Sequence, residues 1–483
     1  MKDNSIIRSL FEPTIELDEL KMTDAYYGTD GDEAGKRETE IQSVDFPIVV
    51  INDYRFKDRE LVRFEIDCTE FIPKIYIEIY IAESSEFYSL SFPKDGDLIS
   101  IFIRGRDDIF KPFRNDFLIT NVDTDSDRSV PIDSRLFISG QLQVPHLYDE
   151  HSFAKQGTSF EVLKEIAREL GLGFATNIEN TADEMNWICA NETYENFIQS
   201  IGDNMWSDAN SFYTVFIDSY YHLNVINLNT QFDDDTESLL GMSDNMISEY
   251  MIDTEHKKTE IQKIFSNHPS FAQSMFYIVT MKPINKSSEI SKNYGYVYNL
   301  NFFEHNSLKD WEFPVEALVT EGNEDSKIIM KGRPNEDFYK TQQKYNYTGI
   351  QYSYPEHNVH ENYYLAKIHN MMNLAEIEKM NVEVTINKIN FNFIRFEKVP
   401  MIYQVDGDQE LGKKLNDELD DEFNANEYAE KIIVDPFYSG WYAIKGFKVE
   451  YTQNEVAAGS VMNSPLKQTF ILTRREWPSA TGE

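Results

Sequence analysis

The chain has 483 residues, of which 83 are Asp or Glu and 45 are Lys or Arg, so its formal net charge is −38. Because single cores rarely exceed about 250–300 residues, several domains are expected, and 41% hydrophobic with 14% aromatic residues excludes a disordered chain. The acidic surplus disfavours a surface that binds nucleic acid or an anionic membrane, since both need basic groups.

The two cysteines, Cys68 and Cys189, are too few for a disulfide framework and lack the spacing of a metal site. This favours a reduced compartment. The apolar core of residues 1–8 is too short for a signal peptide, and no segment approaches the roughly 18 apolar residues that span a bilayer. We therefore expect a protein that is made in the cytoplasm and has no membrane anchor.

The first 40 residues are polar and acidic. They include a glycine-rich stretch at 28–35, which is typical of a flexible segment. We expect residues 1–40 to form an acidic N-terminal arm outside any core.

Residues 41–148 have the period of β-strands. Val62, Phe64 and Ile66 alternate with polar residues, and isoleucines at 75, 77, 79 and 81 do the same. Alternation with one polar face indicates half-buried strands, and several in succession predict an antiparallel barrel or sandwich. Residues 41–148 are therefore expected to form a first β-barrel.

Residues 149–230 are expected to form an inserted α/β domain. Thr158 and Glu161 have the spacing of a capping box, and Gly171 suits the end of the helix that follows Thr158. A second amphipathic helix begins near Tyr194. Aromatic strands at 211–218 and 220–227 are expected around a tight turn.

The last 250 residues divide into two predicted regions. Residues 231–380 are expected to be a mixed α+β region, with strands at 277–281 and 294–303 and a helix at 362–379. Residues 381–483 again alternate and predict a second β-barrel, which an acidic insert at 406–431 interrupts.

No motif for catalysis, cofactor binding or metal binding is complete. Asp123, Asp125 and Asp127 resemble a calcium loop, but Arg128 and Ser134 stand where that loop needs Gly and Glu. His357 and His360 are three residues apart, whereas a zinc helix needs four. We therefore predict no enzyme, no cofactor, and no catalytic or metal-binding residue.

Aromatic residues at five positions allow two interpretations. They can form a platform for stacking sugars or bases, or they can belong to a core. Stacking on nucleic acid needs basic neighbours, which are scarce here, so a core is favoured. The five are Trp187, Trp206, Tyr220, Tyr221 and Trp441.

Several segments together resemble the central tail-hub (baseplate hub) proteins of contractile-tailed bacteriophages, which are similar to the hub part of type VI secretion spike proteins. The resemblance covers residues 95–227 and 437–477. Its segments are 95–103, 117–122, 136–142, 157–172, 186–188, 212–218, 440–446 and 470–477. The arm and the 406–431 insert depart from the pattern.

The resemblance implies a mainly β chain with inserted α/β material and two tail-tube-like antiparallel β-barrels, plus smaller α+β domains. It implies a structural virion protein of the tail baseplate, without enzymatic activity and made in the host cytoplasm. Three chains would form a pseudo-sixfold ring between the hexameric tail-tube protein above and the spike protein below. Other baseplate proteins would surround the ring, and duplex DNA would pass through it at ejection without specific binding.

The resemblance also gives a possible channel lining. If Val62, Phe64 and Ile66 face the barrel core, Glu65 and Asp67 face the other way. Glu78 on the next strand does the same, and the three either line the lumen or meet outer solvent. An acidic lumen would let DNA slide. The alternatives are another baseplate or tube-initiator component and, in a different class, a glycan-cleaving or glycan-binding tail protein.

Overall fold

In the computed structural model the described residues are 7–17, 47–56, 60–82, 87–94, 96–103, 112–125, 133–231, 278–285, 297–304, 307–314, 350–353, 360, 362–377, 380–386, 389, 391, 393–401, 404–405, 433–434, 440–453 and 466–474. Two predicted segments, the glycine-rich stretch 28–35 and the acidic insert 406–431, lie outside these residues. The chain is mainly β, as predicted.

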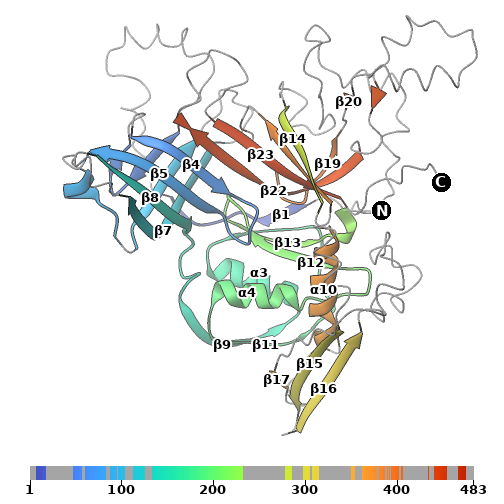
Figure 1. Ribbon diagram of the computed structural model, residues 1–483. Helices are drawn as coiled ribbons and strands as arrows, with labels where there is room; N and C mark the ends of the chain where they lie inside the picture. Colours follow the sequence, from blue (N-terminus) through green and yellow to red (C-terminus); the bar gives the residue numbers. More distant parts are fainter. Residues whose placement is uncertain are drawn as a thin grey trace, which may run out of the picture.

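A 12-stranded sheet dominates the fold (Figure 1). Its strands run in the order β14-β18-β23-β22-β4-β5-β8-β7-β6-β2-β3, and β19 also pairs with β22. The strands are β2 (Ile48–Ile51), β3 (Tyr54–Arg55), β4 (Leu61–Asp67), β5 (Lys74–Ala82), β6 (Leu98–Ile103), β7 (Phe113–Asp125), β8 (Asp133–Leu142), β14 (Ile278–Asn285), β18 (Met380–Ile386), β19 (Lys398–Met401), β22 (Gly440–Thr452) and β23 (Leu466–Thr473).

The two predicted β blocks are parts of this one sheet. The joint is the antiparallel pairing of β22 with β4, in which Lys448 lies opposite Asp67 and Thr452 opposite Arg63. Phe64 and Tyr451 stack across the joint, with ring centroids 5.5 Å apart. Among the described strands the order is an open path, and neither block closes on itself by hydrogen bonds.

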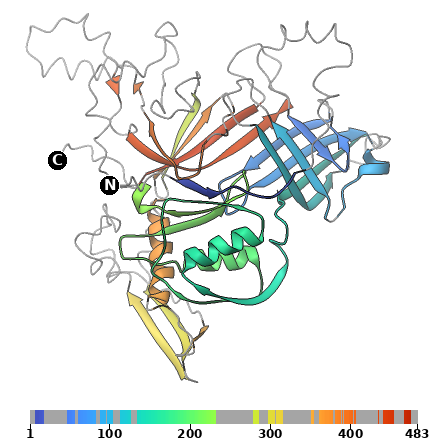
Figure 2. The same cartoon turned by 180° about the vertical axis from the view of Figure 1, so that it is seen from behind.

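The α/β domain lies below the large sheet and has three layers (Figure 2). One layer is a sheet of order β1-β10-β13-β12, and another is the ribbon β9–β11. Two helices pack between them. The elements are β1 (Arg8–Phe11), β9 (Glu150–Gly157), α3 (Ser159–Glu169), β10 (Gly173–Thr176), β11 (Met185–Thr193), α4 (Tyr194–Asp203), β12 (Tyr213–Ile217) and β13 (His222–Asn227).

Helix α3 forms as its sequence predicts. The Thr158 side chain accepts from the Glu161 backbone N–H, and the Glu161 side chain answers at the Thr158 N–H, which completes the capping box. Gly171 has a φ of 71°, a left-handed conformation that favours glycine. Leu163 and Ile166 are fully buried. The turn between β12 and β13 is longer than predicted, since it spans residues 218–221.

The N-terminal residues need a correction. Residues 8–11, expected in an arm outside any core, form β1 and pair antiparallel with β10. Phe11 stacks on Phe174 at 6.0 Å, and the Thr14 N–H donates to the Gly171 carbonyl at 2.8 Å. Composition missed this strand because its partner lies more than 160 residues away in the sequence.

The region between the α/β domain and β18 contains the predicted mixture of elements. Strand β14 and helix α10 (Tyr363–Ile377) confirm the strand expected at 277–281 and the helix expected at 362–379. Strand β15 overlaps in sequence with the strand expected at 294–303. This region also contains a three-stranded sheet of β15 (Val297–Glu304), β16 (Ser307–Pro314) and β17 (Ile350–Ser353). A two-stranded sheet of β20 (Gln404–Val405) and β21 (Ile433–Val434) follows β18 in the sequence. The remaining elements are a π-helix at Phe87–Ser91 and a 3-10 turn at Asn229–Gln231.

Most of the aromatic residues in question are core residues. Trp187, Trp206 and Tyr221 are buried, as the core interpretation predicted. The Tyr220 side chain is partly buried and packs against the same core. The side chain of Trp441 lies outside the described part of the chain. Within that part, no helix has the length and apolar character needed to cross a membrane.

Candidate functional site

The three predicted carboxylates lie on one face of the sheet, around the joint between the β blocks. Opposite residues in an antiparallel pair share a face. Glu78 lies opposite Arg63 on β4, and Arg63 shares its face with Glu65 and Asp67 because residues two apart point the same way. Glu65 lies opposite Glu450 of β22, so this polar face continues into the second β block.

The opposite face of β4 is apolar, as expected. Phe64 and Ile66 are fully buried. Val62 is only half-buried, because a register shift between Leu61 and Arg63 lets Leu61 enter the core instead. A bulge of this kind exchanges the faces of the residues before it.

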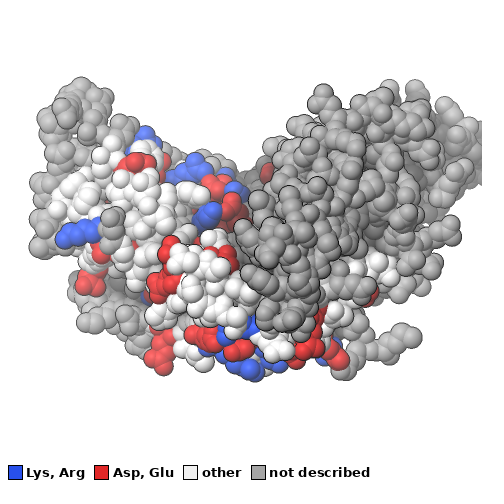
Figure 3. Space-filling view, turned by 90° about the horizontal axis from the view of Figure 1, so that it is seen from below, with Lys and Arg blue, Asp and Glu red and all other residues white. Residues whose placement is uncertain are grey.

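The three carboxylates do not form a purely acidic surface. Lys448 Nζ lies 2.7 Å from Asp67 Oδ2 and 3.0 Å from Glu65 Oε1. Glu78 pairs with Arg135, and Arg63 lies 3.2 Å from Glu65. Acidic and basic groups therefore alternate on this face. The face seen from below in Figure 3 shows a similar mixture of acidic and basic side chains.

The pairing sets the charge states at the joint. Burial alone would raise the pKa of Asp67, but hydrogen bonds from Lys448 and Thr69 outweigh it, and the pKa lies below its ordinary value. Burial would likewise lower the pKa of Lys448, but its bonds to Asp67 and Glu65 raise it. Both groups are therefore charged at neutral pH.

Exposed aromatic side chains that were not predicted as site residues lie beside the carboxylates. Tyr76 and Tyr80 flank Glu78 on β5 and are 48% and 47% exposed. Phe137 of β8 lies opposite Glu78 of β5 and is 38% exposed. The Arg135 guanidinium lies over its ring, 5.4 Å from the centroid. The signal was the placing of tyrosines at the polar positions of an isoleucine alternation.

Arg395 links three parts of the chain close to the β22–β4 pairing: the residues after β4, strand β22 and strand β12. Its guanidinium donates to the carbonyls of Thr69 at 2.7 Å and Glu70, and its Nε donates to Lys445 O at 2.8 Å. Its guanidinium carbon Cζ also lies 4.1 Å from the centroid of the Phe216 ring on β12, a cation–π contact. Burial lowers the pKa of Arg395 to about 10, so the group remains protonated at neutral pH.

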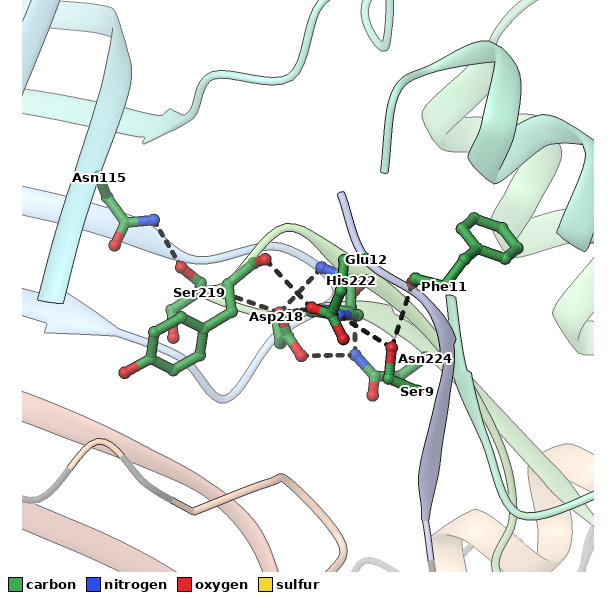
Figure 4. Close-up of polar contacts among 9 residues, drawn as sticks. Ser9, Phe11, Glu12, Asn115, Asp218, Ser219, His222 and Asn224 are labelled. Carbon is green, nitrogen blue, oxygen red and sulfur yellow. Dashed lines mark hydrogen bonds and ion pairs between the residues drawn. The ribbon is translucent and has the colours of Figure 1, made fainter. Parts of the chain in front are cut away.

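A second polar cluster fastens the N-terminal strand to the α/β domain (Figure 4). His222 Nε2 lies 3.4 Å from Ser9 Oγ and 3.3 Å from Glu12 Oε2. Asp218 accepts from the backbone N–H groups of Tyr220 and His222 and from Asn224 Nδ2 at 2.8–3.0 Å. The contacts of His222 with Ser9 and Glu12 join residues about 210 positions apart.

Ser9, His222 and Asp218 are the residue types of a Ser-His-Asp catalytic triad, but their hydrogen bonds differ from those of a triad. His222 Nδ1 lies 3.1 Å from the Tyr220 carbonyl and 3.8 Å from Asp218, so the carboxylate does not orient the imidazole. Ser9 Oγ also donates to Phe11 O at 3.1 Å. The cluster is a structural fastening.

The described residues contain no group of three or more His, Cys, Asp or Glu placed to hold a metal ion. His360 is buried against Asn204 O, and His357 lies outside the described residues. In the cavity of about 250 Å³ next to Arg395, Glu70 pairs with Lys74 and Asp203 with Lys367.

Comparisons with known proteins give structural neighbours only. No protein-family model matches the sequence, and no curated protein matches it. A tail protein from Neisseria meningitidis MC58 is 9% identical with a TM-score of 0.39, over 89% of this chain and 97% of that one. The 43 kDa tail protein of prophage MuSo2 from Shewanella oneidensis is 8% identical with a TM-score of 0.41, over 90% and 97%.

A third solved structure is a component of the Escherichia coli type VI secretion system, described as similar to bacteriophage T4 tail proteins. It is 7% identical with a TM-score of 0.38, over 89% of this chain and 77% of that one. These three solved structures are thus two tail proteins, one of them from a prophage, and one component of a type VI secretion system.

Proposed function

We propose that this chain is a structural component of a phage-like tail, in which three copies form a hub ring between the hexameric tube and the trimeric spike. The observation that carries the proposal is the pairing of β22 with β4, through which both β blocks enter one antiparallel sheet. A ring of three such chains contains six β blocks, the number that matches a sixfold tube.

The two ends of the sheet offer a way to close this ring. Among the described strands, the sheet ends at β14 on one side and at β3 on the other. An edge strand presents backbone groups that another chain can pair with. In the proposed ring, β14 of one copy meets the β2–β3 edge of the next and completes the tube-like barrel walls that one chain leaves open.

The polar face around Glu65, Asp67 and Glu78 is proposed to line the DNA channel. Its basic groups are engaged: Lys448 already bonds to two carboxylates, so it gains less from a phosphate. Affinity for DNA depends on basic groups that release counterions from phosphates. A face of paired charges therefore lets DNA pass without specific binding, although it is less acidic than the sequence analysis expected.

The remaining parts of the proposal follow from this position. The protein belongs to the virion, in the baseplate of a contractile tail, and is made in the host cytoplasm. It contacts the tube protein, the spike and other baseplate proteins, and it has no catalytic role. The second candidate in the same class is another baseplate or tube-initiator component.

Oligomeric mass and symmetry test the proposal. Light scattering should give three times the chain mass of 56.4 kDa in the assembled state. Electron micrographs of the same sample should show a threefold ring with six β blocks. A closed hexamer with one β block of each chain in the ring would contradict the hub and favour the tube-initiator alternative.

A further inference from the structure

Helix α10 docks on the α/β domain through polar side chains in its middle, between the apolar contacts of Tyr363 at its start and Ile377 at its end. Asn370 Nδ2 donates to the carbonyls of Asp203 at 3.1 Å and Met205 at 3.0 Å, and its Oδ1 accepts from the Tyr213 N–H at 3.3 Å. The last carbonyls of a helix lack partners within it. Asp203 is the last residue of α4, so α10 supplies donors for the end of α4 and the connection to β12.

His369 is the neighbour of Asn370 and is held in its neutral form by its surroundings. Its Nε2 lies 3.1 Å from the Ser211 carbonyl, which can only accept, so this nitrogen carries the proton. The Asn373 amide nitrogen, a donor, donates to the His369 carbonyl at 2.8 Å and lies 3.4 Å from both ring nitrogens, Nδ1 included. The ring packs edge-on to Trp206 at 5.3 Å and is 6% exposed. A second proton on Nδ1 would face a donor instead of an acceptor.

His360, just before α10, repeats this arrangement. Its Nε2 lies 3.1 Å from the Asn204 carbonyl, and its Nδ1 is buried without a hydrogen-bond partner in the described structure. The ring lies beside Trp187 at 6.3 Å. A proton added to Nδ1 would be a buried charge without an acceptor, which is costly.

We propose that α10 is an acid-sensitive clasp, which releases its hold on the α4–β12 connection when His369 and His360 become protonated. Because α10 leads directly into β18, release would free the link between the large sheet and the elements that precede α10. The clasp is a property of this chain's own packing and does not depend on the hub assignment.

The charged groups around the clasp oppose its release only in part. Asp208 favours the charged form of His369, and Asp183 favours that of His360. Asp203, at the end of α4, is paired with Lys367 of α10 at 3.3 Å. Burial outweighs the attraction in both histidines: it lowers the pKa of His369 to about 4 and lowers that of His360 below its ordinary value.

The sign of the pH dependence follows from this shift. Between pH 6.5 and about 4 the released His369 binds a proton and the docked one does not, so docking is fully stable above that window and weakens as the pH falls. From pH 8 to pH 5.5, the equilibrium constant for opening should rise about tenfold for His369 alone. Both pH values lie above the sequence pI of about 4.6.

Hydrogen exchange with mass spectrometry on the full chain tests the clasp. After correction for intrinsic rates, opening of residues 363–377 should increase about tenfold from pH 8 to pH 5.5, while amides of β5 keep their protection. The variant His369→Gln retains a donor for Ser211 O but does not titrate, so its increase should be much smaller. His146→Gln, at an exposed histidine, should behave as the unchanged chain.

Two results would overturn the clasp. One is equal opening of α10 at both pH values. The other is the full tenfold increase in His369→Gln, which the double variant His360→Gln/His369→Gln should then show as well. If the double variant folds poorly, the single variant still decides, because a structural role alone would shift opening equally at both pH values.

Discussion

Helix α3 packs inside the α/β domain and helix α10 packs against that domain from outside, and the two helices are held in different ways. Helix α3 buries Leu163, Ile166 and Ala167 completely, and its capping box satisfies its own first turn. Helix α10 also buries apolar side chains such as Ile377, but in addition it uses His369 and Asn370 to bind carbonyls of the α/β domain. The apolar packing of α3 does not depend on pH, because no group in it titrates. The polar contacts of α10 depend on hydrogen-bond partners and on the protonation of His369.

The largest expected effect is at the apolar attachment. Ile166→Asp places an unpaired charge where the side chain is fully buried, which should cost about 4 kcal/mol or prevent folding. Urea unfolding measures the loss. The control Ile166→Val keeps the face apolar and should cost only about 1 kcal/mol. Equal stability of Ile166→Asp and the parent would mean that this face is not packed.

A smaller loss of stability is expected when the hydrogen bonds of Arg395 are removed. Arg395→Met removes donors from three carbonyls and should destabilise the chain by roughly 3 kcal/mol. Arg395→Lys should recover little of this, because an ammonium cannot reach all three carbonyls at once. The midpoint of urea unfolding compares the two variants. Full rescue by lysine would show that charge, and not the fork of donors, matters here.

The third change acts on α10 itself. Asn370→Ala removes three hydrogen bonds and leaves two carbonyls near the end of α4 without these donors, at a cost of about 2 kcal/mol in docking. Hydrogen exchange should increase in residues 363–377 and stay unchanged in α3. An equal increase in both helices would indicate that α10 and α3 open as one unit.

The smallest effect is expected at the start of α3. Thr158→Ala removes the side-chain acceptor of the capping box and should cost about 1 kcal/mol, whereas Thr158→Ser should be nearly neutral. Thermal unfolding of the two variants side by side measures the difference. A serine variant as unstable as the alanine variant would mean that the threonine methyl, not the hydroxyl, contributes the stability.

The same contrast explains what could be predicted from the sequence. The capping box of α3 joins residues three apart, and the strands around Phe64 repeat every two residues, so both are visible as local patterns. The bonds of Asn370 to Asp203 and of Arg395 to Glu70 span 167 and 325 residues. No local period marks such contacts.

The candidate site likewise combines features that a local sequence pattern predicts with contacts that no local pattern marks. That Glu65, Asp67 and Glu78 share a face follows from alternation and was predicted. That Lys448 lies between two of them depends on the register of β22 against β4, which brings together residues some 380 positions apart. The sequence did not predict that these carboxylates are paired with basic groups, and their place in a channel stays a prediction. The strand β1 was missed because its partner β10 lies more than 160 residues away in the sequence.

The central claim is that two β blocks of one chain, joined at β22 and β4, supply two of six positions in a ring of three copies. A cryo-electron microscopy map of the assembled particle tests it most directly. The account predicts threefold symmetry, six β blocks around the channel, and an intact β22–β4 joint within each chain. A sixfold ring in which each chain contributes a single β block, or a ring without the β22–β4 joint, would contradict it.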